Sequence, residues 1–231
     1  MQDELTKHGL KLYKTMADRK HSFGEKFKEI LIEVFIIVFA VTLSIYVHEW
    51  SEHRHEQKEV KEFLKGLKGD LADDIRLIKD SRNTTLGVLK NFDYVYHLKK
   101  NQLPDSIVHH YFLYNLVSTH LNSARYEGFK SSGRIGNIED DNLKQNILIY
   151  YQQTMPNMGD NEGVGNQFQE KLLAYEIDRS DLSINDFLFT PKARSFLQLS
   201  VHNLGNTIDS YDSAMIQANK MIKQIDTELT R

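Results

Sequence analysis

Hydrophobic residues are distributed unevenly along this chain, and the longest apolar run extends from Ile30 to Val47. Only Glu33, Thr42 and Ser44 interrupt it with small or charged polar side chains. As a helix rising about 1.5 Å per residue, the run spans roughly 27 Å, close to a bilayer hydrocarbon core of about 30 Å. It lacks the polar stripe of a helix on a soluble domain. The pattern therefore predicts a transmembrane helix over residues 29–50.

A signal peptide and a buried core helix are the alternatives for a run of this length. A signal peptide is disfavoured because the run begins about thirty residues into the chain and ends in bulky residues instead of small ones. We expect Tyr46 and Trp50 to anchor one end of the span at the membrane interface, as aromatic residues commonly do.

Basic residues flank the span asymmetrically. Lysine and arginine recur through residues 1–28, whereas residues 48–53 contain neither. By the positive-inside rule, residues 1–28 form a cytoplasmic segment and residues 51–231 a periplasmic domain of a bacterial inner-membrane protein. Within the first segment, a short amphipathic helix on the membrane surface and a charged tail are both compatible with the pattern.

A helical rhythm follows the span. Apolar residues spaced by three and four predict a rod that continues from the membrane helix and ends or kinks at residues 83–85. The last segment repeats this spacing over more than four heptads, which predicts a long helix that buries a seam. The two stripes are Val60, Leu64, Leu67, Leu71, Ile75 and Ile78, and Leu197, Val201, Leu204, Ile208, Tyr211, Met215, Ala218, Ile222, Ile225 and Leu229. We expect them to pair antiparallel within the chain, or else to form an intermolecular coiled coil.

Between these stripes, residues 86–100 and 105–121 are predicted to form two antiparallel helices separated by a turn at 101–104. A helix capped by Asp140 or Asp141 is expected from Leu143 to Thr154.

Residues 155–165 contain three glycines and a proline and are predicted to be the clearest loop of the chain. A shorter helix over 168–177 should follow it. The fold class predicted is therefore all-α, with one N-terminal transmembrane helix continuing into a soluble antiparallel helical bundle.

Composition narrows the functional classes. The 231 residues carry 29 basic and 32 acidic side chains, a net charge of -3, without a basic block that would favour nucleic acid. The chain has no cysteine, which excludes disulfides, thiol catalysis and thiolate metal sites. No catalytic motif is present, so we expect neither an enzyme nor a cofactor.

Glu33 is the foremost functional candidate because an ionisable group inside a membrane helix is costly and usually faces protein or water. It could couple ion movement, as in stator-type energisers. Alternatively, its position about one turn into the span allows it to reach headgroups or to pair with Lys26 or Lys28. We favour this structural role, with oligomer contacts as the next alternative.

Just beyond the span, His48, Glu52 and His55 lie at i, i+4 and i+7 on one helix face. Imidazole and carboxylate groups at this spacing could bind zinc. Three ligands on one helix seldom converge without help from another element, so an exposed charge cluster is the favoured interpretation and no metal is expected.

A glycine-bearing bend carries Tyr126, Glu127, Ser131 and Ser132, which could line a ligand or partner pocket in a bundle. A buried tyrosine and a turn built from serine and glycine explain the same residues equally well.

Two of these segments carry a family resemblance. Glu33, the apolar span and Trp50-Ser51-Glu52, followed by Tyr126-Glu127, Ser132-Gly133 and Tyr150-Tyr151, resemble the succession of motifs in an uncharacterised family of single-span inner-membrane proteins of Bacteroidetes-type bacteria. The resemblance covers about residues 23–153. It implies a single-span topology and no activity.

Taken together, these features favour a membrane-anchored periplasmic bundle that binds or scaffolds envelope partners, as a homo-oligomer or within a membrane-protein complex. The first alternative is an accessory, stator-like subunit of an ion-coupled motor or transport complex using Glu33. The second is a ligand-sensing bundle whose small-molecule ligand the sequence does not identify.

Overall fold

The computed structural model describes residues 10, 13 and 23–230, so the amphipathic helix considered for the first 28 residues lies largely outside the described residues. The described residues contain helices and no strand, which confirms the all-α class. In chain order the elements are α2 (Phe23–His97), α3 (Asp105–Tyr111), α4 (Ala124–Ser131), the 3-10 helix η1 (Arg134–Asn137), α5 (Asp141–Ile149), the π-helix η2 (Tyr150–Thr154), α6 (Met155–Asp178), α7 (Ile184–Leu188) and α8 (Pro191–Leu229). The chain divides into two compact units, Met1–Lys58 and Glu59–Arg231.

The described part of the first unit is the beginning of α2. From Phe27 onward its apolar side chains are exposed; Phe35 and Phe39, for example, are 68% and 58% exposed. Very little of the apolar window is buried within the structure, and the helix is long and apolar enough to cross a membrane.

The second unit is a bundle in which α8 runs antiparallel to the part of α2 that follows residue 58. Lys68 Nζ lies 2.5 Å from Asp226 Oδ1, and Arg82 Nε lies 2.7 Å from Asp212 Oδ1. Because the partner number falls by 14 as the α2 number rises by 14, these two ion pairs fix an antiparallel register. The predicted pairing of the two apolar stripes within the chain is therefore confirmed.

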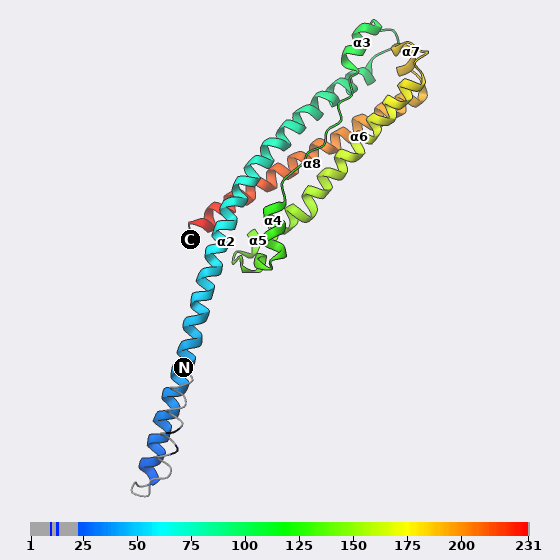
Figure 1. Ribbon diagram of the computed structural model, residues 1–231. Coiled ribbons are helices and arrows are strands. Elements are labelled where there is room, and N and C mark those ends of the chain that lie inside the picture. The colour runs from blue at the N-terminus through cyan, green and yellow to red at the C-terminus, as the bar shows by residue number, and fades with distance from the viewer. Residues whose placement is uncertain (1–9, 11–12, 14–22, 231) are drawn as a thin grey trace. The chain divides into compact units, whose positions relative to one another are not determined.

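Two hydrophobic cores follow one another along this bundle. The first joins the apolar stripe of α2 to the second half of α8. The second lies toward the end of the bundle where Figure 1 shows α3 and α7. The largest fully buried side chains of the first core are Tyr126, Tyr150, Tyr211, Leu64, Leu67, Leu71, Ile78, Ile138, Leu143 and Ile147.

The predicted end of the rod at residues 83–85 is wrong, because α2 continues to His97. The Thr84 hydroxyl donates a hydrogen bond to the Asp80 carbonyl, one helical turn earlier, at 3.1 Å. Asparagine and threonine at positions 83–85 lower the intrinsic stability of the helix slightly, and burial of Val88 and Phe92 in the second core offsets this loss.

The predicted helix over 105–121 is also wrong beyond its first two turns. α3 ends at Tyr111, and residues 112–123, here called the strap, form an extended connection along the bundle to α4 (Figure 1). The predicted turn before Asp105 is confirmed. So is the cap at Asp140, whose Oδ1 accepts a hydrogen bond from the Leu143 amide at 2.9 Å.

Residues 155–165, predicted as a loop, form the first half of α6. Pro156 has no N–H to donate to the carbonyl four residues earlier, and the chain makes the wider turn η2 just before it and then continues as a helix. Gly165 permits close packing against α8, because a Cβ atom there would lie 3.1 Å from Thr207 Oγ1. The short helix predicted over 168–177 is the end of this same element.

Candidate functional site

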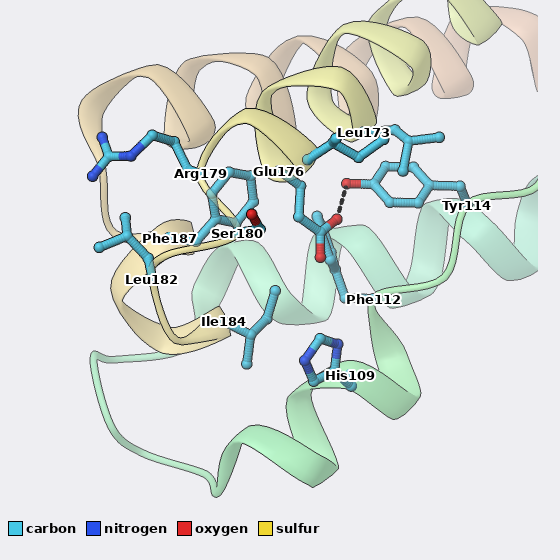
Figure 2. A pocket seen from close by; sticks show the side chains of 11 residues that line it. His109, Phe112, Tyr114, Leu173, Glu176, Arg179, Ser180, Leu182, Ile184 and Phe187 are labelled. Atoms are coloured by element: carbon cyan, nitrogen blue, oxygen red, sulfur yellow. Dashed lines mark hydrogen bonds between the residues drawn. The ribbon is translucent and has the colours of Figure 1, made fainter.

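A cavity of the size of a small-molecule site lies at the end of the bundle that carries α3 and α7. We call this end the cap and the cavity the cap pocket. Its volume is about 520 Å³, within the range of about 300–1,000 Å³ that small-molecule sites occupy. Figure 2 shows its lining, which comes from α3, the start of the strap, the end of α6 and α7: His109, Phe112, Tyr114, Leu173, Glu176, Ile177, Arg179, Ser180, Leu182, Ile184 and Phe187.

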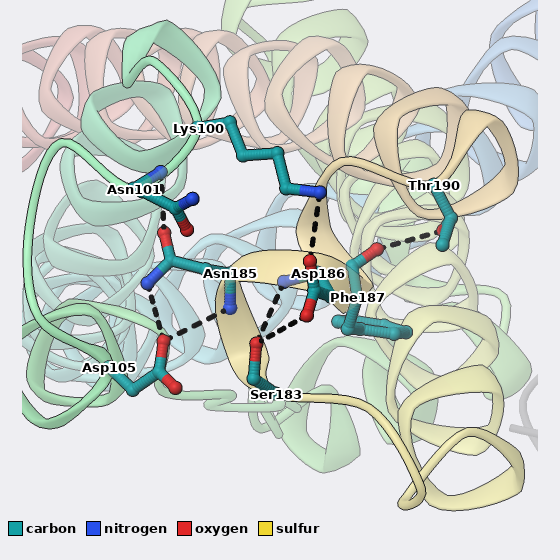
Figure 3. A network of polar contacts seen from close by, with 8 residues as sticks. All are labelled: Lys100, Asn101, Asp105, Ser183, Asn185, Asp186, Phe187 and Thr190. Carbon is teal, nitrogen blue, oxygen red and sulfur yellow. Dashed lines mark hydrogen bonds and ion pairs between the residues drawn. The ribbon is translucent and has the colours of Figure 1, made fainter.

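A network centred on Asn185 holds α7 against the connection between α2 and α3 (Figure 3). Its Oδ1 accepts from the Asn101 amide at 3.2 Å, and its Nδ2 donates to the Leu103 carbonyl at 3.0 Å and to Asp105 Oδ1. Asn101 has a φ of 59°, a left-handed conformation that asparagine adopts more readily than most residues. One side chain thus joins segments more than 80 positions apart in the sequence.

An ion pair supports the same attachment. Lys100 Nζ lies 2.8 Å from Asp186 Oδ1, while Ser183 caps α7 by accepting from the Asp186 amide at 3.1 Å. The hydrogen bond from Lys100 lowers the pKa of the Asp186 carboxyl. These contacts fix α7 and, with it, the pocket residues Ile184 and Phe187.

The polar centre of the cap pocket is the pair Tyr114 and Glu176. Tyr114 Oη donates to Glu176 Oε2 at 2.8 Å, and the second carboxylate oxygen points into the space between Ile184 and His109 (Figure 2). Burial, and then the bond to the carboxylate, raise the pKa of the Tyr114 phenol, so this phenol remains a proton donor. The Arg179 side chain extends away from Glu176, and its Nε lies 3.2 Å from Asp181 Oδ1.

A second polar arrangement runs between the strap and α6. Asn166 accepts from the Val117 amide at 3.1 Å and donates to its carbonyl at 2.7 Å, and Gln169 makes the same pair of bonds with Asn115. Glu162 accepts from the Thr119 amide at 2.9 Å. These three α6 residues occupy positions i, i+4 and i+7 and therefore lie on one face of the helix. Their side chains bond to backbone groups of the strap, which in a sheet would bond to the backbone of a neighbouring strand.

Tyr126, one of the residues predicted to line a pocket, is instead fully buried. Its ring stacks on Tyr151 with centroids 4.3 Å apart, and its hydroxyl accepts from Gln152 Nε2 at 2.8 Å. Beside this pair, Tyr150 Oη donates to Asp74 Oδ2 at 3.4 Å. Burial raises the pKa of the Asp74 carboxyl to about 6, although hydrogen bonds from the Asn122 backbone and Tyr150 partly oppose the shift.

The other members of that predicted set lie at the surface. Glu127 is exposed, and the hydroxyls of Ser131 and Ser132 donate to the carbonyls of Gly128 and Phe129 in α4. Of the four, only Ser132 lines a shallow groove of about 390 Å³ between α2 and α4. The structure therefore does not bring the predicted set together around one cavity.

The candidates in and near the apolar window lie along one helix. Glu33 is only 8% exposed, whereas Tyr46 and Trp50 are 67% and 53% exposed. The guanidinium of Arg54 lies over the Trp50 ring, with Cζ 4.8 Å from the ring centroid. Their proposed roles at a membrane stay predictions.

His48 Nε2 lies 3.9 Å from Glu52 Oε2, with both side chains largely exposed. His55 follows seven residues after His48 on the same helix. In the part of the chain that the structure describes, no three histidine, aspartate or glutamate side chains are grouped closely enough to hold a metal ion.

Sequence reasoning missed the cap pocket. The available signal was the aromatic-rich run at positions 109–115, His-His-Tyr-Phe-Leu-Tyr-Asn, where four of the seven side chains are phenylalanine, tyrosine or leucine. An amphipathic helix would distribute such residues around its circumference, whereas an extended chain turns alternate residues, here Phe112 and Tyr114, to one side.

Within the described residues, the fold is an all-α bundle with one apolar helix long enough to span a bilayer. No protein-family model, curated protein or solved structure significantly matches this chain. The resemblance to the uncharacterised single-span family therefore stays a prediction.

Proposed function

We propose that this protein is a membrane-anchored periplasmic helical bundle that binds partners in the cell envelope as a non-enzymatic scaffolding subunit. One observation carries the proposal: the apolar side chains of residues 30–47 are almost all exposed, whereas the bundle gathers apolar side chains into two buried cores. Exposed apolar surface of this extent needs an apolar solvent, and a bilayer supplies one.

The bundle supports a binding role through its cap. The pocket has a mainly apolar lining and one carboxylate, that of Glu176, and the network at Asn185 holds its walls in place. A preformed cavity with few polar groups suits recognition. The apolar seam between α2 and α8 is filled within the chain, so the bundle does not need a second copy to cover it.

Labelling of introduced cysteines tests the anchor and its orientation, because the native chain has no cysteine. Tyr13→Cys and Ile216→Cys replace residues that are 74% and 71% exposed. In spheroplasts, a membrane-impermeant maleimide should label Ile216→Cys directly and Tyr13→Cys only after lysis. Equal labelling of both before lysis, or release of the protein by alkaline carbonate, would contradict the proposal.

Glu33→Gln separates the scaffold from the ion-coupled alternative. A scaffold should retain its membrane level and its co-purifying proteins in mild detergent, with normal growth of the cells. A stator-like subunit should assemble normally but lose activity, and should co-purify with a multi-span protein. Loss of growth with intact assembly would favour the alternative.

A further inference from the structure

The cap pocket combines an apolar lining with one carboxylate aimed into it. Phe112 and Phe187 are buried and form its floor, and Leu173 and Ile177 are exposed at its rim. Glu176 uses one oxygen to accept from Tyr114, while the other oxygen points into the cavity (Figure 2). An apolar ligand alone would leave this oxygen without a donor, and a polar group cut off from water in this way is costly.

The charges around the cavity favour a cation. Arg179, the basic residue of the lining apart from His109, is directed away from Glu176 and paired with Asp181. Tyr114 meets the carboxylate as a neutral donor and does not cancel its charge. The imidazole of His109, on the opposite wall, offers a further polar contact (Figure 2).

We infer that the cap pocket binds a small organic cation, an ammonium group carried on an apolar body. The ammonium would donate to the free side of the Glu176 carboxylate, and the apolar body would pack on the phenylalanine floor and the Ile177 rim. The inference deepens the proposed function, on which it rests, by naming the ligand class of the cap pocket. A cavity of about 520 Å³ accommodates a ligand of one or two rings.

Calorimetric titration of the full-length protein in detergent micelles tests this with three probes of similar size. The probes are 2-phenylethylammonium, neutral 2-phenylethanol and anionic 3-phenylpropanoate. The ammonium should bind about tenfold more tightly than the alcohol, the difference expected for one charge-assisted hydrogen bond. The carboxylate probe should bind most weakly. Equal affinities for the three probes, or tightest binding of the carboxylate, would overturn the inference.

Glu176→Gln keeps the size of the side chain and its ability to accept from Tyr114 but removes the charge. It should reduce ammonium affinity to that of the alcohol, about a tenfold loss. The matched control is Glu170→Gln, an exposed residue of the same helix outside the pocket, which should leave all affinities unchanged. If both variants bind the ammonium equally well, the inference is wrong.

Ile177→Ser provides a second variant. The side chain is 65% exposed, so its replacement should not impair folding, yet it lines the pocket. It should weaken the ammonium and the alcohol alike. Maleimide labelling of Ile216→Cys reports the membrane orientation of the protein independently of ligand binding. If the orientation is retained but the ammonium probe is not preferred, only the ligand class is refuted. If the orientation is lost, the proposed function is refuted.

Discussion

The two units use the same kind of side chain in opposite ways. Around Phe35 and Phe39 the apolar residues of α2 are exposed, whereas Leu64, Leu67 and Leu71 further along the same helix are fully buried. Backbone hydrogen bonding is helical throughout α2 and does not distinguish the two stretches. The difference lies in the surroundings that each stretch requires, since a continuous apolar surface is favourable in a bilayer, whereas in water it is stabilised when other protein atoms cover it.

Charges placed in the apolar window should produce the largest effect. Val38→Asp combined with Val41→Asp should abolish membrane insertion, because each aspartate near the centre of a span costs about 2.5–3.5 kcal/mol on insertion scales. The carbonate-resistant fraction of the protein measures this. Aspartate at two exposed apolar positions of the bundle, Ile216 and Leu113, is the matched control and should leave that fraction unchanged. Carbonate resistance of the Val38/Val41 variant would contradict a membrane span.

Truncation inside the bundle should come next. Leu67→Ala removes a fully buried side chain from the first core and should lower the free energy of unfolding by about 2–5 kcal/mol. Urea unfolding followed by circular dichroism at 222 nm measures the loss. Val41→Ala, which truncates an exposed residue of the first unit, should leave the bundle transition in place. Equal shifts in the two variants would remove the contrast between the units.

The buried carboxyl of Asp74 should make the bundle sensitive to pH. Its pKa is raised to about 6 in the folded state from 3.8, so between these values the folded state binds more protons than the unfolded state. The free energy of unfolding should therefore fall as pH rises through this window, and the contribution of the protonated carboxyl is lost above about pH 6.

Asp74→Asn should remove this dependence. Relative to the native chain, it should gain about 1–3 kcal/mol at pH 7.5 and nothing at pH 3.5, as judged by urea unfolding at several pH values. Asp73→Asn on the same helix is the control, since that carboxylate is exposed and pairs with Arg76 at 3.2 Å. A native pH slope in Asp74→Asn would show that Asp74 is not the responsible group.

The smallest effect concerns the strap. Asn166→Ala removes both side-chain bonds to the Val117 backbone and should cost about 1–2 kcal/mol, with faster hydrogen exchange at the Val117 amide. Asn161→Ala, a control that loses only a bond to the Asn157 carbonyl in its own helix, should not change that exchange. Unchanged exchange in Asn166→Ala would mean that these bonds do not hold the strap.

Much of the fold could be predicted from local pattern. The apolar window, the stop before Asp105, the cap at Asp140 and the long helix α8 follow from residue spacing and turn chemistry. The antiparallel pairing of α2 with α8 follows from two matching stripes. Each of these features is encoded by nearby residues: a run or a regular spacing of apolar side chains, or a side chain that satisfies a backbone group close to it in the sequence.

The surroundings of Tyr126 and the lining of the cap pocket could not be predicted from local sequence pattern. The sequence marks Tyr126 as a candidate residue. Its stacking on Tyr151 depends on the wide turn η2, in which two consecutive tyrosines, 150 and 151, are both buried. The cap pocket is built from segments far apart in the sequence, which are joined by Asn185, by the Lys100–Asp186 ion pair and by the Tyr114–Glu176 hydrogen bond. No local spacing encodes that meeting.

By itself, the sequence determined the apolar helix, which rests on one long apolar run, and the all-α class and the two stripes that pair, which rest on a regular period of apolar residues. Tertiary structure alone decided the strap and the first half of α6, and the two errors have one cause. α6 places Glu162, Gly165 and Gln169 at buried positions where apolar residues would signal a helix. The side chains of Glu162 and Gln169 bond to the strap backbone in place of helical hydrogen bonds. Each segment takes its conformation from the other, so neither could be recognised alone.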